Sequence, residues 1–240
     1  MSTKKRLIFR KIPLSKNGTG TIIVMSNPSI GLKSKQSDGI DEFCKYLKNI
    51  IESESKLNPK SEVLNVILMG CIVNPRATQK QTVLNALIQR IKWFHATFYI
   101  INSPDVSVFR TFEYLNPKQF IIIDNADAIA LDDFIVQKFN LNLMISYNYD
   151  SNVQSWLKTS TIDEANEVRE AKLFRDSIID DSQQLHPTWF IFGNSKMGFI
   201  SNESLIMSIG HCTLGLNNKI CAILKFYDDF SIENKYVCSY

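Results

Sequence analysis

Four short polar segments hold the residues of this sequence whose types could do chemistry, and each follows an apolar run. Most of their members can donate or accept hydrogen bonds or carry positive charge: Asn27, Pro28 and Ser29; Asn74 and Arg76; Asn194 and Lys196; and His211 and Thr213. One such segment alone is an ordinary exit turn, because Asn, Pro and Ser are common in turns. Four of them, brought together, predict a binding or catalytic site made of hydrogen-bonding groups.

The apolar runs predict the strands that would position these segments. They cover residues 21–26, 63–71, 188–193 and 204–209. Ligands of open α/β sheets bind at the carboxyl ends of the strands. If the four strands are parallel neighbours, the polar segments gather along one edge of the sheet.

Strands and helices alternate along the whole chain. This alternation predicts an α/β fold in which a mostly parallel central sheet is covered by helices on both faces, that is, a three-layer α/β/α sandwich. Asp38 is placed to cap the first helix, and Pro104 to occupy the first position of the third. The remaining strands are predicted at 5–12, 97–101, 119–124, 141–146 and 219–226, and the helices at 38–51, 80–94, 104–115, 125–139 and 162–179.

The composition is that of one globular domain over residues 1–240, with 45% hydrophobic and 21% charged residues. The net charge of +3 is too small to indicate a nucleic-acid partner by itself, so any affinity for DNA would depend on local patches. The cations between Lys4 and Lys16 form either such a patch or a solvated basic tail.

Several classes of protein are disfavoured by motifs that the sequence lacks. No apolar run reaches membrane-spanning length and no signal-peptide pattern opens the chain, so we expect no membrane partner. The five cysteines are scattered, which argues against zinc and iron–sulfur sites and suits reduced thiols in the cytoplasm. There is no phosphate-binding loop, no dinucleotide fingerprint and no Gly-x-Ser-x-Gly turn. We therefore expect no metal, no nucleotide or other organic cofactor, and a monomer.

The order of the polar segments resembles the motif order of the uracil-DNA glycosylase superfamily. Met25-Ser26-Asn27-Pro28-Ser29 stands where members have a short turn such as Gly-Gln-Asp-Pro after the first strand. The run 66–70 leads to Val73-Asn74-Pro75-Arg76, and 190–193 matches a late strand that ends in Trp-Gly. The segment 211–216 matches the His-Pro-Ser-Pro-Leu region, although it lacks the proline that follows the histidine in that motif.

The chain also looks like a little-characterised bacterial and phage family, glycosylase-like in fold, with an Asn-Pro-Ser turn, a following Asp and an Arg-Ala-Thr motif. Asn27-Pro28-Ser29, Asp38 and Arg76-Ala77-Thr78 match in that order. The two resemblances cover residues 20–80 and 188–217. Residues 95–187 match neither family, and we expect them to be an elaboration of the domain.

The resemblance implies a uracil-DNA glycosylase-like fold and hydrolysis of the N-glycosidic bond of a flipped-out base, which leaves an abasic site. Asn27 would hold the attacking water and His211 would donate a hydrogen bond to the leaving base. The DNA contacts would come from residues in all four segments: Pro28, Ser29, Asn74, Arg76, Asn194, Lys196, Thr213, Leu214 and Gly215. Leu214 or Leu216 would fill the gap that the flipped base leaves.

The resemblance does not identify the target base, but the extra segment motivates one hypothesis about it. Residues 95–187 and the aromatic stretch with Tyr147, Tyr149 and Trp156 indicate an altered pocket. One hypothesis is a modified pyrimidine, such as the glucosylated hydroxymethylcytosine of phage DNA, with a role in antiphage defence. Two alternatives stay open: a DNA-binding module of the same fold that does not cut, and an unrelated small-molecule hydrolase or transferase on a doubly wound sheet.

Overall fold

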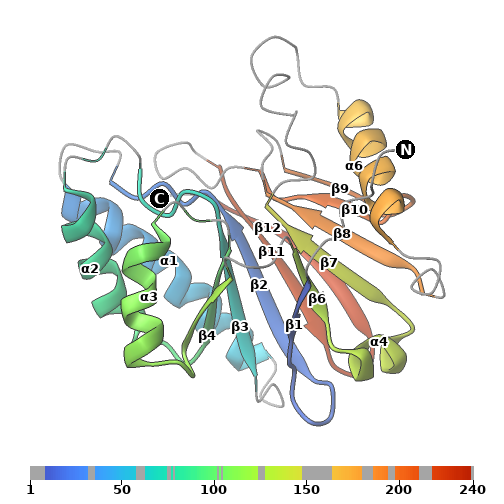
Figure 1. The fold of residues 1–240 in the computed structure, drawn as a ribbon, viewed down its shortest axis with the longest axis horizontal. Coiled ribbons are helices and arrows are strands. Elements are labelled where there is room, and N and C mark those ends of the chain that lie inside the picture. Colours follow the sequence, from blue (N-terminus) through green and yellow to red (C-terminus); the bar gives the residue numbers. More distant parts are fainter. Residues whose placement is uncertain are drawn as a thin grey trace.

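A computed structural model of the chain describes residues 9–31, 36–57, 63–74, 77, 79–101, 103, 105–123, 128–147, 164–179, 186–193, 198–210 and 218–238. These residues form two six-stranded sheets with helices on the two outer sides (Figure 1). The protein is therefore α/β, as the alternation of elements predicted. The single central sheet of that prediction is replaced by two sheets that face each other.

The first sheet has the strand order β12-β11-β2-β3-β4-β5. Four parallel strands form one part of this sheet: β2 (Gly20–Ser26), β3 (Leu64–Met69), β4 (Thr97–Ile101) and β5 (Phe120–Ile123). Val24, for example, pairs with Ile67 of β3, and Ile67 pairs with Tyr99 of β4. All seven residues of β2 are buried, as expected for a strand covered on both faces. The antiparallel strands β11 (Asn218–Phe226) and β12 (Phe230–Cys238) extend the sheet beyond β2.

The second sheet has the strand order β1-β6-β7-β8-β10-β9. Its central strands β7 (Asn142–Ser146), β8 (Thr188–Phe192) and β10 (Ile206–Ser208) are parallel to one another. On one side, β6 (Ala128–Leu131) runs antiparallel to β7, and β1 (Phe9–Ile12) forms the edge. On the other side, β9 (Phe199–Ser201) runs antiparallel to β10.

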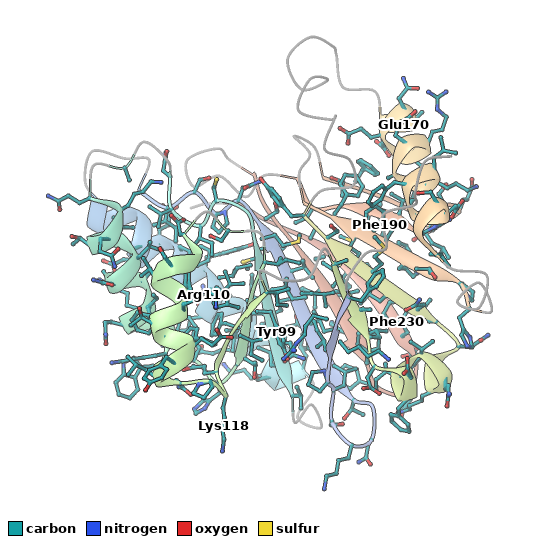
Figure 2. All side chains as sticks on the ribbon, viewed as in Figure 1. Tyr99, Arg110, Lys118, Glu170, Phe190 and Phe230 are labelled. Atoms are coloured by element: carbon teal, nitrogen blue, oxygen red, sulfur yellow. The ribbon has the colours of Figure 1, made fainter. Side chains whose placement is uncertain are left out.

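Three apolar layers hold these elements together. Helices α1 (Gln36–Leu57), α2 (Lys80–Ile91) and α3 (Val106–Leu115) pack on the outer face of the first sheet. A second layer lies between the two sheets and contains Tyr99, and a third lies between the second sheet and α6 (Glu164–Ile178). Phe190, which is labelled in Figure 2, belongs to this third layer. Its ring centroid is 5.7 Å from that of Phe174 on α6.

Several predicted elements need correction. The helix predicted at 125–139 is wrong, because Ala128–Leu131 is a strand that pairs with β1. In the described part of this range the helix is α4 (Asp133–Phe139). The carboxylate of Asp132 caps α4 by accepting from the Phe134 amide at 3.0 Å. Asp38 does not cap α1, which begins two residues earlier, and Asp105 rather than Pro104 stands next to the start of α3. The prediction also missed β9 and β12.

The segment 95–187 is built into both sheets. It supplies β4 and β5 of the first sheet and β6 and β7 of the second, together with α3, α4 and α6. The chain leaves the first sheet after β5 and enters the second at β6, and it returns to the first sheet between β10 and β11. A further change of sheet lies near the amino end of the described chain, between β1 of the second sheet and β2 of the first.

Candidate functional site

Asn27 follows the last residue of β2 in a backbone conformation that few side chains adopt. Its φ is +46° and that of Ser29 is +48°, so both lie in the left-handed region, where Asn is the more tolerant of the two. Pro28 stands between them and cannot continue the ladder. Asn27 is only 2% exposed, so its amide must find partners inside the protein.

The side chain of Asn27 makes three hydrogen bonds. Its Oδ1 accepts from the backbone amide of Cys71 at 2.9 Å and from the hydroxyl of Tyr147 at 3.0 Å. Its Nδ2 donates to the hydroxyl of Ser26 at 3.2 Å. Asn27 thus ties together the exits of β2, β3 and β7, and β7 belongs to the other sheet.

The ends of the two sheets meet directly at this point. The Ser26 hydroxyl donates to the carbonyl oxygen of Gly193, the residue after β8, at 2.5 Å. A Cβ on Gly193 would lie 2.5 Å from Ser26 Oγ, and one on Gly70 would lie 2.3 Å from Asn27 Oδ1 and 2.4 Å from Tyr147 Cε2. Two glycines therefore make room for the contact between the sheets.

The exits of β2 and β3 stay paired beyond the strands, which places Asn74 at the same edge. Ile30 bridges Val73, and the Asn74 amide donates to the Ile30 carbonyl at 2.8 Å. Asp105, at the exit of β4 and 6% exposed, accepts from the Val73 amide at 3.3 Å, and its other oxygen lies 4.0 Å from Lys80 Nζ. A buried carboxylate thus supports the segment that carries Asn74.

Tyr147 and Cys71, two described titratable residues that bond to Asn27 through a hydroxyl and a backbone amide, are neutral at physiological pH. Burial raises the pKa of the Tyr147 phenol, although its hydrogen bond to Asn27 acts in the opposite direction. Burial also raises the pKa of the Cys71 thiol, with a further upward contribution from Asp105. The groups around Asn27 therefore act by hydrogen bonding rather than by charge.

The structure brings together some of the predicted site residues. Asn27, Pro28, Ser29 and Asn74 lie at the exits of two neighbouring strands. The other predicted residues fall outside the described part of the chain: Arg76, Asn194, Lys196, His211, Thr213, Leu214 and Gly215. Their described neighbours Gly193 and Gly210 follow β8 and β10, which are parallel neighbours in the second sheet.

The expectation that all four strands share one sheet is wrong. β2 and β3 lie in the first sheet, whereas β8 and β10 lie in the second. The bond from Ser26 to Gly193 nevertheless places the exits of β2 and β8 side by side. Ser26 and Cys71 were not among the predicted site residues, and Tyr147 was linked to a pocket only as part of an aromatic stretch.

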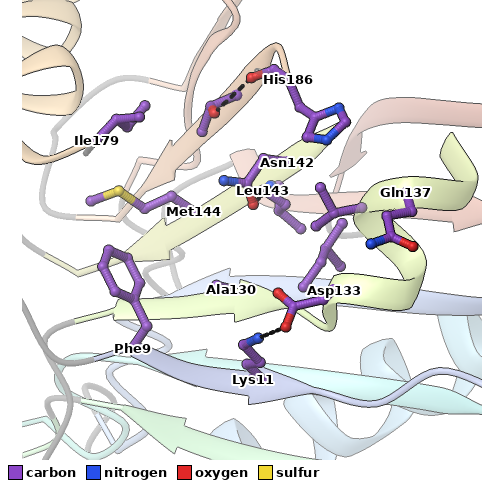
Figure 3. A pocket seen from close by; sticks show the side chains of 13 residues that line it. Phe9, Lys11, Ala130, Asp133, Gln137, Asn142, Leu143, Met144, Ile179 and His186 are labelled. Carbon is purple, nitrogen blue, oxygen red and sulfur yellow. Dashed lines mark hydrogen bonds and ion pairs between the residues drawn. The ribbon is translucent and has the colours of Figure 1, made fainter. Parts of the chain in front are cut away.

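A separate cavity of about 250 Å³ lies on the outer face of the second sheet, toward the amino ends of β7 and β8 (Figure 3). Its walls are mostly apolar, with an ion pair between Lys11 and Asp133 at one side and His186 at another. The imidazole Nδ1 of His186 lies 2.7 Å from Asn140 Oδ1. No described member of the predicted site lines this cavity.

Within the described ranges, no group of three or more His, Cys, Asp or Glu side chains is arranged to hold a metal ion. No helix in the same ranges is long and apolar enough to cross a membrane. The chain matches no protein-family model, and no curated protein is significantly similar to it in sequence.

Proposed function

We propose that this protein is a DNA glycosylase of uracil-DNA glycosylase-like ancestry that removes a flipped-out, modified pyrimidine base and leaves an abasic site. The observation that carries the proposal is the buried Asn27 at the meeting point of the two sheets, held in a left-handed turn and bonded to groups from three strand exits. Strained polar residues of this kind cluster at functional sites. The motif order of the sequence supplies the link to glycosylases.

In this proposal the base leaves as an anion while the sugar develops oxocarbenium character. His211 stabilises the departing base with a hydrogen bond, and water attacks the opposite face of the sugar. Asn74 reads the base edge or a phosphate. In this proposal the late strand β8 reaches the site from the second sheet, since its exit contacts that of β2 through Ser26 and Gly193.

In this mechanism Asn27 can hold the attacking water only if its side-chain oxygen has a free lone pair. An amide oxygen has two lone pairs, and here both are occupied by donors from Cys71 and Tyr147. A water can bind to Asn27 Oδ1 only if it replaces the Tyr147 hydroxyl, because the Cys71 amide is part of the backbone. The base therefore binds while Tyr147 still donates to Asn27, and the Tyr147 hydroxyl has to move away in a later step before Asn27 can orient the water.

The two donors that occupy Asn27 Oδ1 also favour a second candidate function, a DNA-binding module that does not cleave the N-glycosidic bond. In that case Asn27 is a structural link between the sheets, and its side-chain oxygen, already bonded to two donors, binds no water. The two candidates differ in one result: a binding module retains DNA affinity and releases no base.

The test is base release from a panel of DNA substrates, measured as abasic sites. The panel contains single strands and duplexes with uracil, 5-hydroxymethylcytosine and glucosylated 5-hydroxymethylcytosine. We expect release from at least one modified pyrimidine. Cleavage of uracil DNA alone removes the modified-base hypothesis, and binding without release supports the module.

Asn140 offers a matched control for the Asn27→Ala variant. Both residues are asparagines at a φ near +48°, so replacement by Ala brings similar backbone strain, but Asn140 follows α4 and bonds to His186. We expect Asn27→Ala to lose at least tenfold in base release and Asn140→Ala to stay within about twofold of wild type. Equal activity of the two variants would contradict a role for Asn27 in catalysis.

A further inference from the structure

The direction of every hydrogen bond around Asn27 is set by its partners. The Cys71 backbone amide can only donate, so the atom facing it must be the side-chain oxygen of Asn27. The Gly193 carbonyl can only accept, so the Ser26 hydroxyl donates to it and is left to accept from Asn27 Nδ2. The hydrogen bond with Cys71 and the hydrogen bond with Ser26 therefore require the same orientation of the Asn27 amide.

This orientation determines what Tyr147 can do. Because it faces Asn27 Oδ1, the phenol must use its single proton to donate to that oxygen. Its own oxygen keeps its capacity to accept, and no described residue donates to it. A phenol in this state presents only an acceptor to a ligand. The raised pKa means that the proton stays on the oxygen throughout the physiological range.

The position of Tyr147 places this acceptor at the candidate site. Tyr147 is the first residue after β7 and is half-buried. The tip of its ring lies over Gly70, in the space that a Cβ of residue 70 would occupy. The phenol thus stands beside Asn27 at the edge where the exits of β2, β3 and β8 meet.

We propose that Tyr147 is a base-recognition residue, whose oxygen accepts a hydrogen bond from an N–H group on the edge of the target base. The inference rests on the proposed function and narrows its substrate class: the base must carry an imino or amino hydrogen on the edge that faces Tyr147. A base with that hydrogen replaced by methyl loses the bond and meets the phenol oxygen with a methyl group.

The experiment compares wild-type protein with Tyr147→Phe on matched pairs of duplexes. One pair contains uracil or 3-methyluracil, and the other contains 5-hydroxymethylcytosine or its N4,N4-dimethyl derivative. The readouts are the Kd of each duplex and, for any duplex that is cut, the single-turnover rate of base release. Tyr227→Phe is the control, because the Tyr227 hydroxyl bonds to Thr21 at the opposite end of β2.

For at least one pair we expect Tyr147→Phe to raise the Kd of the duplex with the N–H base about tenfold, the effect of one lost hydrogen bond, and to leave the Kd of the duplex with the methylated base within about twofold of wild type. An equal loss on both members of each pair, or no loss on either, overturns the inference. Failure of wild-type protein to release any base overturns the glycosylase proposal instead, and the comparison of Kd values still decides the role of Tyr147.

Discussion

Ser26 of the first sheet and Gly193 of the second are joined by a hydrogen bond of 2.5 Å between a side-chain hydroxyl and a backbone carbonyl. Ser26 is fully buried, and the same oxygen accepts from Asn27. The bond therefore has two consequences: it fixes how the two sheets meet, and it sets the direction of the bonds around Asn27.

Replacing Ser26 by Ala should destabilise the protein by about 1–3 kcal/mol, because it leaves both the Gly193 carbonyl and one Asn27 donor without this partner in the interior. The measurement is the free energy of unfolding in urea. Ser177→Ala is the control: the Ser177 hydroxyl also donates to a backbone carbonyl, but at the exposed surface of α6, and its loss should cost less than about 0.5 kcal/mol. Similar costs for the two variants would show that the bond between the sheets contributes little.

Gly70→Ala should be more destabilising than Gly31→Ala. Both glycines have positive φ, +73° and +93°, so both variants carry the strain of a left-handed Ala. At Gly31 the nearest atom to the new Cβ is 3.5 Å away, whereas at Gly70 the Cβ would overlap Asn27 and Tyr147. The difference in unfolding free energy isolates the overlap, which we expect to cost about 1–3 kcal/mol. If Gly70→Ala were no less stable than Gly31→Ala, the side chains of Asn27 and Tyr147 would be able to move away from the new methyl group at little cost.

The buried parallel strands were the most predictable part of this fold. Runs such as Ile22–Met25 and Val66–Met69 are apolar at every position, because both faces of the first sheet are covered. The short strand Ala128–Leu131 was taken for the start of a helix, since four apolar residues before the true cap at Asp132 extend a helical pattern.

The pairing of the two sheets could not be predicted in the same way. A strand buried under a helix and one buried under another sheet carry the same apolar residues, so the sequence does not say what covers each face. Ile22 and Ile23 are both completely buried, yet Ile22 faces the second sheet and Ile23 faces the helices.

The candidate site was partly predictable for a related reason. Asn27 stood out because a polar turn follows a buried strand, a signal that is local in sequence. Its partner Tyr147 lies 120 residues away, and the bond depends on the meeting of two sheets. No pattern within one segment of the sequence contains that information.

The rate at which the Cys71 thiol is alkylated should show whether DNA is bound at the candidate site. It is partly exposed, whereas Cys44 and Cys221 are buried, so among these three thiols it should be alkylated first by iodoacetamide. Because burial raises its pKa, alkylation should be slow at pH 7 and accelerate above pH 9. Peptide mapping by mass spectrometry gives the rate at each cysteine. Bound substrate DNA should slow alkylation of Cys71 at least threefold, and an unchanged rate would place the DNA elsewhere.

The stability of the protein should fall in alkali, in part through Cys44. Burial raises the pKa of the Cys44 thiol from its ordinary 9.0 to about 11, with Arg90 lowering it and Asp41 raising it to smaller extents. Between these values the unfolded chain loses a proton that the folded protein keeps, so the contribution of Cys44 is complete below pH 9 and is lost as the pH rises to about 11.

Cys44→Ala cannot ionise, which makes it the reference for this effect. The variant should be less stable than wild type at pH 7 because of the cavity that it leaves in the layer between α1 and the first sheet. That difference should shrink by up to about 2 kcal/mol between pH 9 and pH 11, since only wild type loses the contribution of the thiol. Urea unfolding at a series of pH values measures both curves. Parallel curves would show that the thiol of Cys44 ionises equally easily in the folded and unfolded chain.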